Sequence, residues 1–241
     1  MRFRFLPFLC LLLLSQISLG QQQTIEVPFE NQTGAGSPFD VTGKVLVRET
    51  IAGNQSESSW EDEVVLKNTS DKPIVLLIAH LNAVGPHSNR ANMLTIDRFF
   101  KGVLHSGDSF PLPGEMLEGS REVICCINPL DKGRDPKATF RVSFVQFLDG
   151  STFGDPADAQ DVFASRTTVV NALRELARTY SEQGEKQFHI QLAASDASSG
   201  VFIRIRQTEQ AKGTEAAISQ VRSMLTLAKE REAIIGMKSA R

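Results

Sequence analysis

Hydrophobic and polar residues alternate with a period of two through the first two thirds of the chain, which is the pattern of half-buried β-strands. The strands expected from this alternation cover residues 24–30, 41–51, 60–68, 74–81, 93–104 (with a break near Gly102), 121–128 and 140–147. The run 74–81 is almost wholly apolar, so we expect that strand to be buried on both faces. About seven strands separated by turn-rich segments, such as 107–114, is the spacing of an antiparallel β-sandwich.

The pattern changes near residue 150. Asp149-Gly150 predicts a tight turn, after which 151–153 would return briefly as a strand, with Gly154 relieving the backbone. Asp155-Pro156 then predicts a helix start, because the Asp carboxylate caps free N–H groups and proline suits the first helical position.

Helical periodicity governs the rest of the chain. The apolar positions that form one stripe after the cap are Val162, Val169, Leu173, Leu176 and Tyr180. Gly184 is a natural helix end. Residues 185–194 fit a short helix or a strand, and 201–206 fit a strand or a helical turn. A last helix is expected from 214 to about 235.

The N-terminus has the features of a secretory signal peptide. Arg2 and Arg4 precede the apolar run 9–14, and Ser18 and Gly20 supply small residues before the expected cleavage. The apolar run is too short to span a membrane. We therefore expect an exported protein, periplasmic or extracellular, with no stable membrane anchor once the leader is removed.

Composition narrows the class of protein further. The formal net charge is −2, and no basic patch predicts a nucleic-acid partner. Beyond the leader the chain has two cysteines, Cys125 and Cys126, which are adjacent and would form a strained bridge. This usage favours a bacterial export product stabilised by its core rather than by disulfides. The glycosylation sequons at Asn31, Asn54 and Asn68 carry little weight, because such triplets arise easily by chance.

Two short motifs suggest a fold family. The segment Asn68-Thr69-Ser70-Asp71-Lys72-Pro73-Ile74 and the later Phe110-Pro111-Leu112-Pro113-Gly114-Glu115 resemble turns of bacterial immunoglobulin-like or fibronectin-type modules. The resemblance covers roughly residues 24–155, and the usual cysteine pair and core tryptophan pattern are absent. It implies an immunoglobulin-like fold for this β part of the chain. Together with the leader and the helical pattern, we expect a mainly β plus α chain: a signal peptide (1–20), an antiparallel immunoglobulin-like β-sandwich of about seven strands (21–155) and a helical C-terminal extension (156–241).

The candidate chemistry is sparse. His80, His87 and His105 lie at predicted strand ends and, with Asp149, would make the ligand set of a metal-dependent hydrolase. The loop 149–155 has the many oxygen atoms that a calcium site needs. A structural role explains the same residues: Asp149-Gly150 forms the turn, Gly154 relieves the backbone and Asp155 caps the helix. Cys125 and Cys126 lie among apolar residues, so a core role is favoured over a reactive thiol. Glu61, Asp62 and Glu63 form a charge run typical of a solvated face.

No catalytic motif is present, so we expect neither catalytic residues nor a cofactor, and the favoured hypothesis is a non-enzymatic binding or assembly module. Its partner would be a protein or a glycan, recognised by loops such as 82–90 and 129–136. The apolar stripe of the tail either packs within its own chain or joins a second copy.

Overall fold

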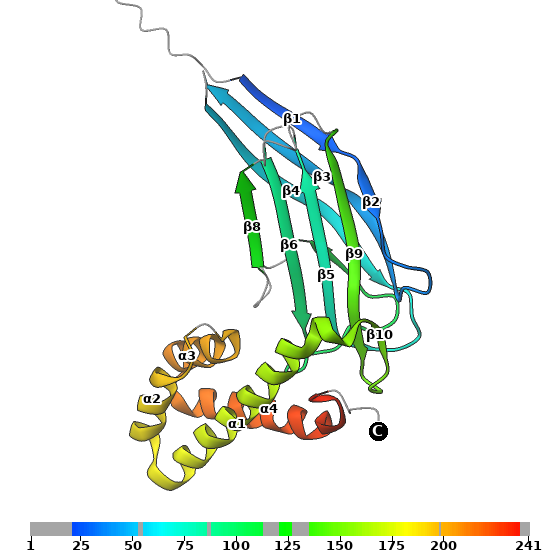
Figure 1. The fold of residues 1–241 in the computed structure, drawn as a ribbon. Coiled ribbons are helices and arrows are strands. Elements are labelled where there is room, and N and C mark those ends of the chain that lie inside the picture. The colour runs from blue at the N-terminus through cyan, green and yellow to red at the C-terminus, as the bar shows by residue number, and fades with distance from the viewer. Residues whose placement is uncertain are drawn as a thin grey trace, which may run out of the picture.

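The computed structural model describes residues 21–52, 55–85, 88–112, 121–126, 135–197 and 199–236, and the expected signal peptide lies outside these ranges. Two β-sheets come first in the chain, and a body of helices follows them (Figure 1). The four-stranded sheet has the order β1 (Gln21–Val27), β3 (Phe39–Ala52), β4 (Gln55–Asn68), β7 (Ser109–Leu112). The six-stranded sheet has the order β10 (Thr152–Gly154), β9 (Lys137–Phe147), β5 (Ile74–Val84), β6 (Ser88–Asp97), β8 (Arg121–Cys126), and β2 (Phe29–Asn31) pairs with β9.

The two sheets pack face to face around one apolar core. Alternate residues of each strand enter it, as the period-two pattern predicts. The four-stranded sheet contributes Val45, Val47, Val64 and Leu66, and the six-stranded sheet contributes Ile74, Leu77, Leu81, Phe140 and Val142. The sequence therefore predicted the inward positions of the central strands correctly.

The first predicted strand is in fact two strands in different sheets. β1 pairs antiparallel with β3, whereas β2 pairs parallel with β9. The division falls at Pro28, whose missing N–H cannot join a ladder. The Pro28 carbonyl still accepts from the backbone N–H of Ala138 at 2.7 Å, so the chain crosses between the sheets with that group satisfied.

Several strand boundaries differ from those predicted. β3 and β4 pair residue by residue from Phe39–Asn68 to Ala52–Gln55, so β4 starts before Trp60. β5 continues to Val84 and β6 begins at Ser88, so the predicted recognition loop 82–90 is largely strand. The other predicted loop, 129–136, lies outside the described residues except for Asp135 and Pro136. β7 was read as turn, because Pro111 and the nearby glycines hid a short edge strand.

The strand predicted over 93–104 ends at Asp97. Phe99 and Phe100 follow it in a turn, with ring centroids 5.0 Å apart in an edge-to-face contact. Phe99 is fully buried and packs with Val170 and Ala228 of the helices. The apolar residues after Asp97 therefore serve the contact between sheet and helices, which a period count along one strand cannot reveal.

Four helices make up the second part of the chain: α1 (Gln160–Gln183), α2 (Glu185–Ala194), α3 (Gly200–Lys212) and α4 (Thr214–Glu230). Short 3-10 turns precede α1 (Pro156–Ala159) and follow α4 (Glu232–Ile234). The strand alternatives at 185–194 and 201–206 are wrong, because Phe188, Leu192 and Phe202 enter a common helical core. The predicted cap is confirmed, since Asp155 Oδ1 accepts from the Ala157 N–H at 2.9 Å.

The apolar stripe of α1 is buried within the chain. Val169, Leu173 and Leu176 lie in the helical core with residues of α4. We name the helices and their flanking 3-10 turns, residues 156–236, the helical unit. No helix in the described part of the chain combines the length and the apolar character needed to cross a membrane.

The helical unit covers one end of the outer face of the six-stranded sheet and projects away from it (Figure 1). Leu76, Ile78 and Phe144 point outward from that sheet and pack against Phe163 and Ala159 of the helical unit. This burial explains why the 74–81 run is apolar at nearly every position, as the sequence predicted.

Gly154 is required where β10 leaves the sheet, and replacing it with alanine should destabilise the protein. Its φ is +86°, and a Cβ atom there would lie 1.9 Å from the Ser143 carbonyl oxygen. We expect Gly154→Ala to lower the free energy of unfolding by about 1–3 kcal/mol, measured by urea denaturation. Gly102→Ala is the matched control, because open space surrounds Gly102. Equal stability of the two variants would contradict the assignment.

Candidate functional site

A buried polar cluster lies where the helical unit meets the six-stranded sheet. Arg166 of α1 is 1% exposed. Its guanidinium donates to both carboxylate oxygens of Asp97, at 2.8 and 3.0 Å, and to Gln146 Oε1 at 2.7 Å. The same group lies over the rings of Phe99 and Phe163, 4.8 and 5.5 Å from their centroids. Arg166 therefore joins β6, β9 and α1 through one side chain.

The end of the helical unit completes this junction. The Ile234 carbonyl accepts from Arg166 Nη1 at 3.1 Å and from Gln146 Nε2 at 3.2 Å. Arg231 Nη1 donates to the carbonyls of Arg98, Phe99 and Lys101 at 2.8–2.9 Å. Burial lowers the pKa of the Arg231 guanidinium from its ordinary value. These hydrogen bonds hold the junction in one arrangement.

Arg166 was missed in the sequence, although a signal existed. It stands in the apolar stripe of α1, three residues after Phe163 and three before Val169. A charged residue at a core position of an amphipathic helix predicts a buried partner.

The cluster that most resembles catalytic machinery is Lys72, Asp149 and Ser151. Lys72 Nζ lies 2.7 Å from Asp149 Oδ2 and donates to Ser151 Oγ at 2.9 Å. Ser151 Oγ donates to Asp149 Oδ1 at 2.6 Å. A serine and a lysine at this distance can form a nucleophile and base pair. Here the lysine is an ammonium paired with a carboxylate, and an ammonium has no lone pair to accept the serine proton.

The same geometry speaks against the calcium hypothesis for 149–155. The Lys72 ammonium already occupies the position at which a cation would meet the Asp149 carboxylate. Asp155 is engaged as the helix cap. The loop is therefore explained by its own hydrogen bonds, as the structural interpretation of the sequence predicted.

Asp149 should make stability depend on pH only in strong acid. Hydrogen bonds from Lys72 and then Ser151 lower the pKa of Asp149 from 3.8 to about 2. Because the pKa of Asp149 is lower in the folded than in the unfolded protein, its ionised carboxylate stabilises the fold at pH values above the unfolded pKa. This stabilisation is lost as the pH falls toward 2. We expect the difference in unfolding free energy between wild type and Asp149→Asn to shrink from pH 5 to pH 2 in urea titrations. A difference that grows toward pH 2 would contradict this pairing.

The histidines of the hydrolase hypothesis do not converge in the described part of the chain. His80 lies in β5, opposite Arg141 and Met93. His105 follows Leu104, which forms a β-bridge with Ile74, the first residue of β5. His80 lies further along the same strand, so the two histidines are separated by roughly 20 Å. Asp149 pairs with Lys72, which also lies near the start of β5, and His87 lies outside the described residues. Among the described residues, no three His, Cys, Asp or Glu side chains are placed to hold a metal ion.

A second buried ion pair joins the two sheets inside the sandwich. Asp62 of β4 accepts from Arg90 Nη1 at 2.9 Å and also from Arg90 Nη2, and both side chains are under 10% exposed. The Asn92 amide oxygen, in the orientation that satisfies its neighbours, accepts from Arg90 Nε at 2.8 Å. Asp62 is thus not part of a solvated run, and its alternation with Trp60, Val64 and Leu66 was the signal that it points inward.

The structure places some of the remaining sequence candidates. Cys125 and Cys126 lie in β8, opposite Asn89 and Ser88 of β6. The Asn68 side chain is fully buried and donates to the carbonyls of Lys72 and Leu104, so the sequon at Asn68 is inaccessible in the folded protein. Asn31 is exposed, and Asn54 lies outside the described residues.

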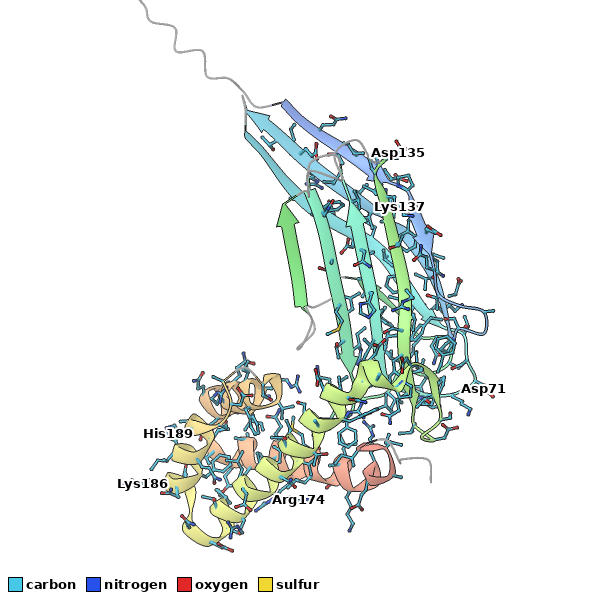
Figure 2. The ribbon with its side chains drawn as sticks, in the orientation of Figure 1. Asp71, Asp135, Lys137, Arg174, Lys186 and His189 are labelled. Carbon is cyan, nitrogen blue, oxygen red and sulfur yellow. The ribbon has the colours of Figure 1, made fainter. Side chains whose placement is uncertain are left out.

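One surface beside the junction is left open. On the half of the outer face of the six-stranded sheet away from the helical unit, the outward positions described on β9, β5 and β6 are exposed or partly exposed, and most are polar. Figure 2 labels Lys137 on this part of the sheet. His80 and Asn82 follow the covered Leu76 and Ile78 on the outward side of β5. Lys137, at the far end of β9, pairs with Glu30 at 3.6 Å. This half-face is the candidate functional site of the described chain.

Comparisons with protein-family models, with curated proteins and with solved structures found no match to this chain.

Proposed function

We propose that this protein is an exported, non-enzymatic binding or assembly module that recognises a protein or a glycan. The observation that carries the proposal is the division of one sheet face. The helical unit is fixed to one half through Arg166 and two apolar clusters. The other half stays open and polar. A rigid body beside an open sheet face supplies a fixed geometry for recognition, and rigid elements position binding residues well.

The strand order supports an immunoglobulin-like sandwich as the scaffold. β4 pairs with β7, as strand B pairs with strand E in immunoglobulin domains. β5, which follows β4 in the chain, belongs to the other sheet and lies between β9 and β6, as strand C lies between F and C′. β1 outside β3 and β8 outside β6 are additions to that plan. Export is supported by the basic and apolar pattern of residues 1–20.

Site-specific photo-crosslinking tests the proposed binding role. A photo-reactive amino acid in place of Arg141 would probe the open half-face in cells that export the protein. The same residue in place of Lys44 probes the outer face of the four-stranded sheet, where Lys44 is paired with Glu63 at 3.3 Å. We expect discrete adducts from position 141 only. Equal adducts from both positions, or none from either, would overturn the proposal.

Metal analysis of the purified mature protein separates this function from the hydrolase hypothesis. We expect no stoichiometric transition metal, because His80 is far from His105 and Asp149 along β5. A bound metal that is lost in His80→Ala would refute the non-enzymatic proposal. The intact mass in the same experiment tests export, since cleavage after Gly20 would leave Gln21 as the first residue.

A further inference from the structure

The two outer sheet faces differ in how their charges are matched. On the four-stranded sheet, Lys44 lies 3.3 Å from Glu63 and 4.0 Å from Glu26. On the same face Arg48 lies 2.5 Å from Glu61. Each of these cations has a carboxylate on a neighbouring strand, so Lys44 and Arg48 are already matched and offer little to an acidic partner.

The open half-face of the six-stranded sheet is different. Strand register sets six outward positions in two rows across β9, β5 and β6. We call these residues the open patch: Arg141, His80 and Met93 in one row, and Thr139, Asn82 and Ala91 in the next. Arg141, Asn82 and Ala91 are exposed, and the other three are partly exposed.

The polar groups of the open patch are unmatched within the described chain. The side chains of Arg141, His80 and Asn82 have no hydrogen bond or ion pair to any residue that the structure describes. Arg141 lies directly opposite His80, so two nitrogen-rich side chains are adjacent with no carboxylate between them. A guanidinium and an imidazole both carry N–H donors, so an anion placed between them can accept from both side chains.

We infer that the open patch docks a protein partner through an acidic side chain of that partner, seated between Arg141 and His80. A guanidinium presents a planar pair of N–H donors that matches a carboxylate. Small residues in the second row, Ala91 and Thr139, leave the surface flat enough for a protein to approach. Arginine and methionine are both enriched in protein interfaces, and Met93 borders the patch where it meets the helical unit. This inference rests on the proposed binding function and adds the chemistry of the partner.

Binding of a fluorescent oligoglutamate peptide, followed by anisotropy at low ionic strength, tests the inference. We expect wild type to bind and Arg141→Glu to bind at least about tenfold more weakly, because charge reversal replaces attraction by repulsion. Lys44→Glu makes the same change in net charge on the other sheet and should bind as wild type does. Raising the salt to about 0.15 M should weaken wild-type binding, since exposed charges are screened.

Three outcomes would overturn the inference: no binding by wild type, equal weakening in Arg141→Glu and Lys44→Glu, or binding of heparin but not of oligoglutamate. The last result would assign the patch to a sulfated polymer. Circular dichroism of both variants confirms that they are folded. Crosslinking from position 141 without oligoglutamate binding would leave the binding function standing and remove only the acidic partner.

Discussion

Replacing Arg166 with methionine should lower the free energy of unfolding by about 3–5 kcal/mol, the cost of removing one partner from a buried ion pair. Methionine keeps much of the apolar stem but none of the donors. Asp97, Gln146 and the Ile234 carbonyl then lose hydrogen bonds at the junction. The stacking of the guanidinium on Phe99 and Phe163 is also lost.

Urea denaturation followed by two probes measures this effect. The chain has one tryptophan, Trp60, which reports on the sandwich, while far-UV circular dichroism reports mainly on the helices. We expect both transitions to move to lower urea together, because Arg166 joins the two parts. Arg174→Met is the control: Arg174 is on the same helix but exposed, and bonds only Asn171 there (Figure 2). A shift of the helical signal alone would show that Arg166 stabilises only the helical unit.

Asp62→Ala should be nearly as damaging, with a loss of about 3–5 kcal/mol. The substitution leaves the Arg90 guanidinium inside the sandwich, where its side chain is 6% exposed, without its carboxylate. The cost comes from the loss of a buried charge pair rather than from lost contact area. Asp62→Asn retains an acceptor for Arg90 and should cost less than Asp62→Ala.

The adjacent residue supplies the control for Asp62. Glu61→Ala removes a carboxylate from the exposed pair with Arg48, and such surface pairs contribute about 0–1 kcal/mol. Urea titrations of the three variants at neutral pH give the comparison. Equal losses in Asp62→Ala and Glu61→Ala would show that burial of the Arg90 pair has no energetic weight.

The pattern of the sequence predicted the central strands, the helix start at Asp155 and the apolar stripe of α1. These features follow from local periodicity and capping, which depend on residues close together in the chain. The same reasoning failed where an element served a distant partner. Phe99 and Phe100 were read as strand because their apolar character was visible, while the helices they contact lie far along the chain.

For the candidate site too, the sequence named the residues but not how they are placed. The sequence supplied the list of histidines and carboxylates but not their distances, so His80, His105 and Asp149 could be grouped although strand register separates them. Asp62 and Glu61 are neighbours in sequence and differ completely in environment, because successive strand residues point to opposite faces.

By itself, the sequence determined the class of the two main segments: strands first, and helices after Asp155. Only the tertiary structure decided that the helical unit covers half of one sheet face, that Arg166 holds it there, and that Arg141 and His80 remain uncovered beside it. The physical reason is that burial and ion pairing are set by contacts between residues such as Asp97 and Arg166, which are 69 positions apart in the chain.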